Sequence, residues 1–219
     1  MDLETFKMKA AEDESWAPGW DEIDAAFAAV YEDQEPAHYG TVMTSRAMFG
    51  GDQYLDGYSI FSSEKGYKHL VTYGLTELYT NEDSLGGEHS FWGYEMTIKL
   101  PVKSAEECMW AVDMLSNLAR YTNESKRYLE AYQFIGGNGE SIHIGEESRI
   151  TALVTVPDTE IAARDTLYGK VEFIQLVGVT ETEFQEVKRD PSLIHQLVEN
   201  LREDYPDLVT DMARTKDYL

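Results

Sequence analysis

Residues 94–100 alternate strictly between apolar and polar side chains, from Tyr94 to Leu100. Successive side chains of a β-strand point to opposite faces of a sheet, so a period of two is typical of a strand with one packed face and one wet face. A slip of one residue would turn the apolar side chains to solvent, so the pattern also fixes the register. It therefore predicts a sheet that buries one face and leaves the other in water.

Further segments have the composition of strands. Residues 171–177 are apolar on nearly both faces, which predicts a central strand. The other predicted strands are rich in Tyr, Thr and Val and lie between Gly- and Ser-containing turns. They are residues 38–49, 54–61, 67–73 and 149–156.

Helix starts carry their own signals. A proline suits the first turn of a helix predicted over residues 18–31. Ser104 with Glu107, and Thr180 with Glu183, have the spacing of a capping box, in which a hydroxyl and a glutamate bond each other's backbone. A last helix is expected after Pro191, with Ile194, Leu197, Val198 and Leu201 as its buried stripe. Strands in a block, with helices at the start, middle and end, favour an α+β fold.

The chain of 219 residues is long enough for one sizeable core, and Pro and Gly do not cluster strongly enough to divide it. Residues 1–14 lack a convincing period, so we expect a mobile acidic tail followed by a single domain over residues 15–219. Cys108 is the one cysteine, which excludes an intrachain disulfide. It lies on an apolar helix stripe, so we expect a buried small hydrophobe.

Charge excludes some partners. The 41 acidic residues outnumber the 18 basic ones, for a formal net charge of −23. Such a chain is repelled by nucleic acid and by an anionic membrane surface and can attract a basic protein, although the charge can also serve solubility alone. There is no signal peptide at the start and no apolar run of membrane-spanning length, so we expect a soluble cytoplasmic protein.

No catalytic, metal or cofactor site stands out. The five histidines lack the helical spacing of a zinc hydrolase, and the Gly-rich residues 135–141 lack the lysine of a phosphate loop. A binding role is therefore favoured by elimination. An enzyme with a dispersed site that includes His69, His143 and Glu95 stays open, as does a structural or chaperone-like domain with an exposed apolar patch.

Several ordered motifs are more specific. They include HLVTYGLTELY at residues 69–79, FWGYEMTIKL at 91–100, LARY at 118–121, FIQLVGVT at 173–180 and VTDMAR at 209–214. With shorter matches from residue 18 onward, this set resembles the N-terminal domain of the suppressor-of-fused family. The resemblance implies a twisted, mixed, largely antiparallel sheet flanked by helices, and a binding fold without catalytic residues.

The resemblance also implies where a partner binds. Animal members hold a peptide of a zinc-finger transcription factor as an added β-strand between two domains, a mode in which main-chain bonds give affinity. By this resemblance, Tyr121 and Asp158 belong to the peptide-contact region. Asn138 or Glu140 stands where the family has an aspartate.

Single-domain sequences of this kind resemble those found in bacteria beside polymorphic toxin genes, where they are proposed to be immunity proteins. Many nuclease toxins are basic, and an acidic inhibitor would be steered toward them. We therefore expect a non-catalytic protein that binds and neutralises a basic partner, by strand addition or through another surface.

Overall fold

The computed structural model describes residues 1–32, 34–40 and 54–219. In this part of the chain, strands pair in the order β1-β2-β3-β4-β8-β6-β5, with β7 beside β8. β4 and β8 run parallel and the other pairs are antiparallel, so the prediction of a mixed, largely antiparallel sheet is confirmed. The strands are β1 (Ala37–Gly40), β2 (Gly57–Ser62), β3 (Lys68–Tyr73), β4 (His89–Leu100), β5 (Phe134–Gly136), β6 (Ile150–Pro157), β7 (Arg164–Thr166) and β8 (Gly169–Thr180).

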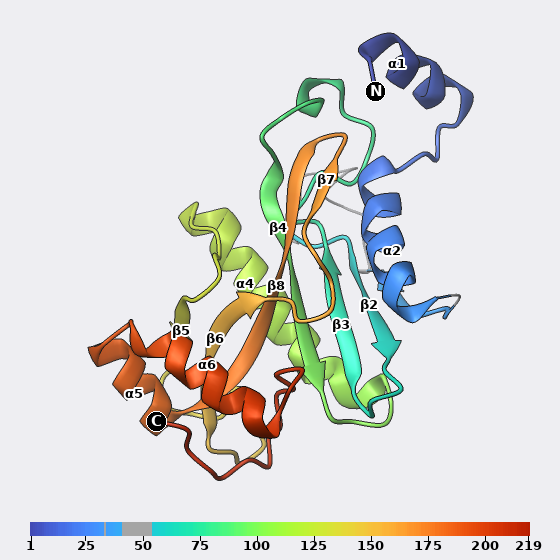
Figure 1. Ribbon diagram of the computed structural model, residues 1–219. Helices are drawn as coiled ribbons and strands as arrows, with labels where there is room; N and C mark the ends of the chain where they lie inside the picture. The colour runs from blue at the N-terminus through green and yellow to red at the C-terminus, as the bar shows by residue number, and fades with distance from the viewer. Residues whose placement is uncertain (33, 41–53) are drawn as a thin grey trace.

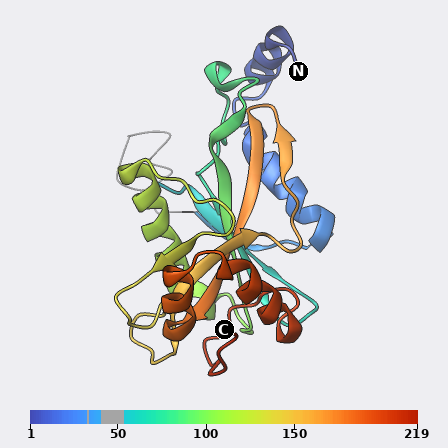
Figure 2. The ribbon, with the colours of Figure 1, turned by 60° about the vertical axis from the view of Figure 1, so that its left-hand side comes forward.

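Helices cover both faces of the sheet. Figure 2 shows α4 and α2 on opposite sides of β4 and β8. The apolar stripe of α4 packs against β3 and β4, α2 packs against β2, β3 and β8, and α5 and α6 pack against β6 and β8. The helices are α1 (Leu3–Glu12), α2 (Pro18–Tyr31), α4 (Met109–Ser125), α5 (Glu181–Arg189) and α6 (Leu193–Asp204), with the short 3-10 helices η1 (Glu82–Ser84) and η2 (Glu106–Cys108).

The predicted central strand lies where expected. Residues 171–177 fall within β8, which has β4 on one side and β6 on the other. Cys108 is fully buried in the core under α4, as its place on the apolar stripe indicates. Of the strand predicted over residues 38–49, residues 38–40 belong to β1, and residues 41–49 lie outside the described residues.

The N-terminal segment contains a helix, although its sequence has no convincing period. Residues 3–12 form α1, which Asp2 caps by accepting a hydrogen bond from the Thr5 backbone. Phe6 is buried against the rings of Trp16 and Tyr168. Figure 1 places this helix at the top of the molecule, beyond the end of α2. The weak periodicity reflects a helix that buries a single side chain rather than a full stripe.

The two predicted capping boxes have different outcomes. Thr180 and Glu183 form both reciprocal bonds at the start of α5. At the other, the Glu107 carboxylate accepts from the Ser104 backbone, but η2 intervenes and α4 begins only at Met109 without a side-chain cap. The second motif therefore stabilises the turn before the helix, and the predicted helix start was too early.

The expectation of a wet sheet face was wrong. The polar residues of the alternating strand, Glu95, Thr97 and Lys99, are fully buried. Their face is covered by α2, by the segment that follows β6 and by the C-terminal segment after α6, where Thr210 donates its backbone N–H to the carbonyl of Lys99. Alternation in β4 therefore separates an apolar buried face from a polar buried face.

Candidate functional site

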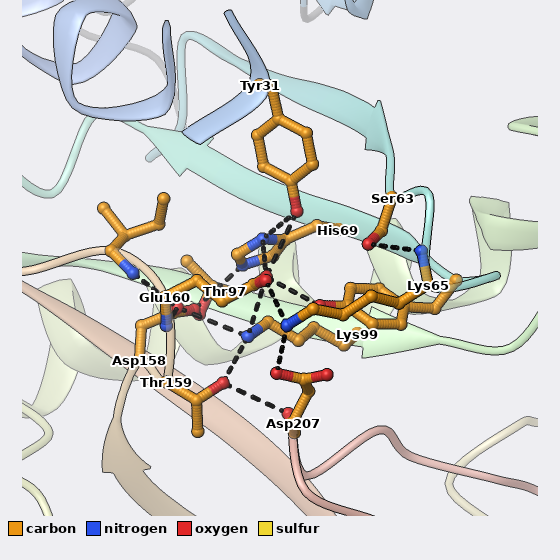
Figure 3. Close-up of polar contacts among 12 residues, drawn as sticks. Tyr31, Ser63, Lys65, His69, Thr97, Lys99, Asp158, Thr159, Glu160 and Asp207 are labelled. Carbon is orange, nitrogen blue, oxygen red and sulfur yellow. Dashed lines mark hydrogen bonds and ion pairs between the residues drawn. The ribbon is translucent and has the colours of Figure 1, made fainter. Parts of the chain in front are cut away.

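The polar face of the sheet holds a network of buried charged groups, drawn in Figure 3. Asp158 is at its centre, directly after β6. One carboxylate oxygen accepts from His69 Nε2 at 2.8 Å and from Thr97 Oγ1 at 2.5 Å. The other accepts from the backbone N–H groups of Glu160 and Ile161, so the carboxylate also holds the turn that it belongs to.

A second carboxylate extends the network to the surface. Glu160 accepts from the Tyr67 hydroxyl at 2.7 Å and from Lys65 Nζ at 2.9 Å. Lys65 is half-exposed and also binds Asp207 of the C-terminal segment at 2.8 Å. The buried Lys99 ammonium lies 3.3 Å from Glu160. The network thus ties β3, β4, the turn after β6 and the C-terminal segment together.

Both carboxylates are held ionised. Burial opposes ionisation of Asp158, but hydrogen bonds from His69 and Thr97 and the nearby charge of Lys99 hold its pKa well below the usual range. Burial likewise opposes ionisation of Glu160, and the hydrogen bonds from Tyr67 and Lys65 still lower its pKa to about 2. Each charge is therefore compensated inside the protein, which is the condition for burying it.

Glu95 forms a separate buried site on the same face. Its carboxylate accepts from the backbone of Gly74, Leu75 and Thr76 and from the hydroxyls of Thr76 and Thr72. Burial raises the pKa of Glu95 to about 7 in spite of these hydrogen bonds. The side chain acts as a cap on the turn after β3, and no substrate needs to be invoked to explain it.

The three residues considered for a dispersed enzyme site do not come together. His69 and Glu95 are fully buried in these two networks. His143 stacks on Trp110 of α4 with ring centroids 4.7 Å apart, and this pair belongs to the other face of the sheet. Among the described residues, no group of three or more His, Cys, Asp and Glu side chains is arranged to hold a metal ion. Nor is any described helix long and apolar enough to cross a membrane.

A large groove opens on the α4 side. Its volume is about 1060 Å³, and its walls come from α4, the segment 126–130 that follows it, β5, and the segment between β5 and β6. We call it the α4–β5 groove. The side chains that line it include Trp110, Met114, Leu118, Tyr121, Tyr128, Ile135, Ile142 and Ile144.

Large apolar side chains are unusually exposed in this groove. Tyr121 is 45% exposed, Tyr128 53% and Ile144 88%. The stacking of the preceding His143 on Trp110 fixes the base of the Ile144 loop. Scattered exposed apolar residues are ordinary, but a contiguous exposed set around one concave surface is typical of a binding site.

β5 forms one wall of the groove and ends the strand order of the sheet. Its outer edge has no strand partner among the described residues, whereas its inner edge pairs with β6. From behind, Phe184 of α5 approaches Gly136 so closely that a Cβ there would lie 2.2 Å from the ring. Any larger residue at position 136 would therefore force the Phe184 ring of α5 to move.

The four residues suggested by the resemblance lie in different environments. Tyr121 lines the groove, and Asn138 and Glu140 follow β5, where both are exposed and hydrogen-bond each other at 2.9 Å. Asp158 binds Thr97, which points away from α4, so its carboxylate is on the opposite face of the sheet. Partner contact by these residues stays a prediction, and in this conformation the Asp158 carboxylate is inaccessible.

Sequence reasoning missed Tyr128 and Ile144, which give the groove much of its exposed apolar surface. The only sequence signal for Ile144 is an apolar residue beside Gly145 in an otherwise polar stretch. Tyr128 carries none, since a tyrosine after two basic residues is equally consistent with a buried position.

Comparison with known proteins places this fold in a family. Residues 51–215 match the family model described as suppressor of fused protein (SUFU). The suppressor of fused homologues of Homo sapiens and Mus musculus are each 28% identical to the chain over 163 residues. These matches cover 67% of this chain but 31% of each relative, so the chain spans about a third of their length.

Solved structures agree with the fold. The structure of a Sufu–Fu complex superposes with a TM-score of 0.78 at 24% identity, over 92% of this chain and 93% of that one. Drosophila suppressor of fused gives 0.78 at 23% identity, over 92% of this chain and 51% of that one. A SUFU homologue from Neisseria gonorrhoeae gives 0.61 at 14% identity, over 90% and 96%. Since the family model covers most of the chain, this protein belongs to the suppressor of fused family.

Proposed function

We propose that this protein is a non-catalytic binding domain whose protein partner docks in the α4–β5 groove. The observation that carries the proposal is the exposure of Tyr121, Tyr128 and Ile144 around a single concave surface. Tyrosine is favoured in interfaces because its ring buries a large area while its hydroxyl keeps a polar partner. One of the similar structures is a complex of Sufu with Fu, which supports a protein partner here.

The outer edge of β5, which has no strand partner among the described residues, supports binding by strand addition. An extended segment along this edge would bond its main chain to β5 while its side chains entered the groove. β5 has only three residues, so the edge alone offers few hydrogen bonds. The apolar side chains of the groove would then supply most of the affinity.

The partner we propose is a basic protein, such as a nuclease toxin that this chain neutralises in the cytoplasm. The support is the net charge of −23, which attracts a basic protein and raises its association rate at low salt. Rate enhancement of this kind falls as salt screens the charges, so the association rate should depend steeply on ionic strength.

Co-purification from the native host at low salt tests this function, with Tyr121→Ser and Tyr128→Ser variants beside the unmodified chain. We expect one stoichiometric protein that both variants fail to retain and that dissociates more readily as salt increases. Retention of the same protein by both variants would contradict docking in the groove. Recovery of nothing above background at low salt would contradict a stable protein partner.

A further inference from the structure

The loop between β5 and β6 separates two hollows. Ile142 and Ile144 of this loop line the α4–β5 groove. Glu140, Glu146 and Glu147 of the same loop line a second, open hollow of about 620 Å³, which we call the acidic hollow. In Figure 2 this loop is the yellow segment at the lower left, directly below β5. A ligand that leaves the groove over this loop therefore meets carboxylates.

The negative charge of the acidic hollow is not compensated within the described residues. Arg149 also lines it but is paired with Asp217 at 2.9 Å. Arg214 is buried in an ion pair with Glu183 at 2.7 Å. The three exposed glutamates form no ion pair in this part of the chain. The hollow therefore favours a cationic group brought by a ligand.

We infer that the occupant is an extended segment of the partner with two parts: apolar side chains that enter the α4–β5 groove, and lysine or arginine side chains that cross the β5–β6 loop into the acidic hollow. This inference rests on the proposed function and adds to it the chemistry of the bound segment. Apolar anchors with complementary charge at the rim are the usual anatomy of a specific interface.

The inference is distinct from general attraction by an acidic protein. The net charge of −23 attracts any basic surface from a distance at low salt. At physiological salt this long-range attraction is largely screened, because it acts over distances greater than about 8–10 Å. Only basic groups held close to Glu140, Glu146 and Glu147 would gain from these carboxylates in the bound state. The local effect should therefore persist at salt concentrations that remove the long-range one.

Random twelve-residue peptides displayed on phage, selected against the full chain, provide a probe that works before any partner has been identified. We expect the selected peptides to carry an apolar run with Lys or Arg on one side of it. Affinities of the synthetic peptides are then measured by fluorescence polarisation. The triple change Glu140→Gln, Glu146→Gln and Glu147→Gln should weaken binding about tenfold, at roughly 0.5 kcal/mol for each exposed charge contact.

The matched control removes the same charge elsewhere. Glu12, Glu14 and Glu64 are exposed and outside both hollows, and their replacement by Gln should change the affinity less than about twofold. Equal effects of the two triple variants would overturn the inference and leave the proposed function standing, provided that Tyr128→Ser still abolishes binding.

Other outcomes separate the remaining possibilities. Selected peptides that bind equally well to Tyr121→Ser and Tyr128→Ser, or the absence of any binding peptide, would overturn both the inference and the proposed function. The alternative occupant of the groove is a second copy of the chain. Light scattering tests it by measuring the molar mass of the unmodified chain and of Tyr128→Ser in solution. A dimer that this variant dissociates would show that the groove takes a second copy of the chain, and would overturn the inference.

Discussion

The two faces of β4 are equally buried, but one carries apolar side chains and the other carries polar and charged side chains. Toward α4, Met96 and Ile98 pack into an apolar core. Toward the other side, Thr97 and Lys99 are equally inaccessible but belong to the network around Asp158. Burial alone therefore does not distinguish the faces. The apolar face is held by non-directional packing, and the polar face by hydrogen bonds and charges that need defined partners.

This contrast has a consequence for function. On the apolar side, α4 contributes both to the core and to the wall of the open α4–β5 groove. The polar network fixes elements from distant parts of the chain at defined distances, as Lys65 does by binding both Glu160 and Asp207. We interpret the polar face as the rigid support and the α4 face as the side where a partner is accommodated. The following predictions test the contrast.

The largest effect is expected for Asp158→Ala. Removing this carboxylate leaves Lys99 buried without its full set of partners and releases the turn after β6. Breaking one side of a buried charged network costs about 3–5 kcal/mol of unfolding free energy. Chemical denaturation at neutral pH measures it. A loss below about 1 kcal/mol would show that solvent reaches the network and that the polar face is not rigid.

The second prediction compares the unfolding free energies of Glu160→Gln and of the unmodified chain across a pH series. Only the polar face should give a difference that depends on pH. The pKa of Glu160 lies near 2 in the fold and near 4.5 when unperturbed. Between these values the unfolded chain binds more protons at this site, so the stability contributed by the carboxylate is present above about pH 4.5 and is lost as the pH falls toward 2. We expect Glu160→Gln to be less stable than the unmodified chain by on the order of 2–3 kcal/mol at pH 7, and the difference to shrink steadily as the pH falls from about 4.5 toward 2.

Leu115→Ala is the matched control on the apolar face. Leu115 is fully buried under α4, so this change should cost about 3 kcal/mol through lost contacts and a cavity. Its cost should stay nearly constant across the same pH series, because no titrating group is removed. A Glu160→Gln difference that is equally constant would contradict the assignment of an ionised carboxylate to the polar face.

The smallest effect is expected for Tyr128→Ser in the groove. Tyr128 is more than half exposed, and such substitutions usually change the unfolding free energy by less than about 0.5 kcal/mol. Thermal or chemical denaturation checks this directly. A larger loss would mean that the side chain supports the fold, which would weaken its assignment to partner binding.

Local patterns predicted local structure well. The spacing of Thr180 and Glu183 predicted the start of α5, and the apolar run in β8 predicted a central strand. The alternation in β4 predicted that its faces differ but not that both are covered. Asp158 and Thr210 are among the residues that cover this face, and both lie far from β4 in sequence, so no local pattern in residues 94–100 reports them.

The candidate site could be predicted only in part, because some of its residues are brought together by contacts between distant parts of the chain. Family resemblance indicated Tyr121, which does line the groove. It also indicated Asp158, whose buried partners His69 and Lys99 come from neighbouring strands that a linear motif does not reveal. Ile144 and Tyr128 gain their importance only from the concave surface around them, which forms when α4 and β5 are brought together.

The contact between Gly136 and Phe184 makes the two sides of β5 unequal in how much sequence change they can accept. Behind the strand, any side chain at position 136 would displace an aromatic ring, so this position is confined to the smallest residue. In front, the exposed groove positions Tyr121, Tyr128 and Ile144 can vary with little effect on the core. Related chains could thus diversify what they recognise while the strand that presents it keeps its place.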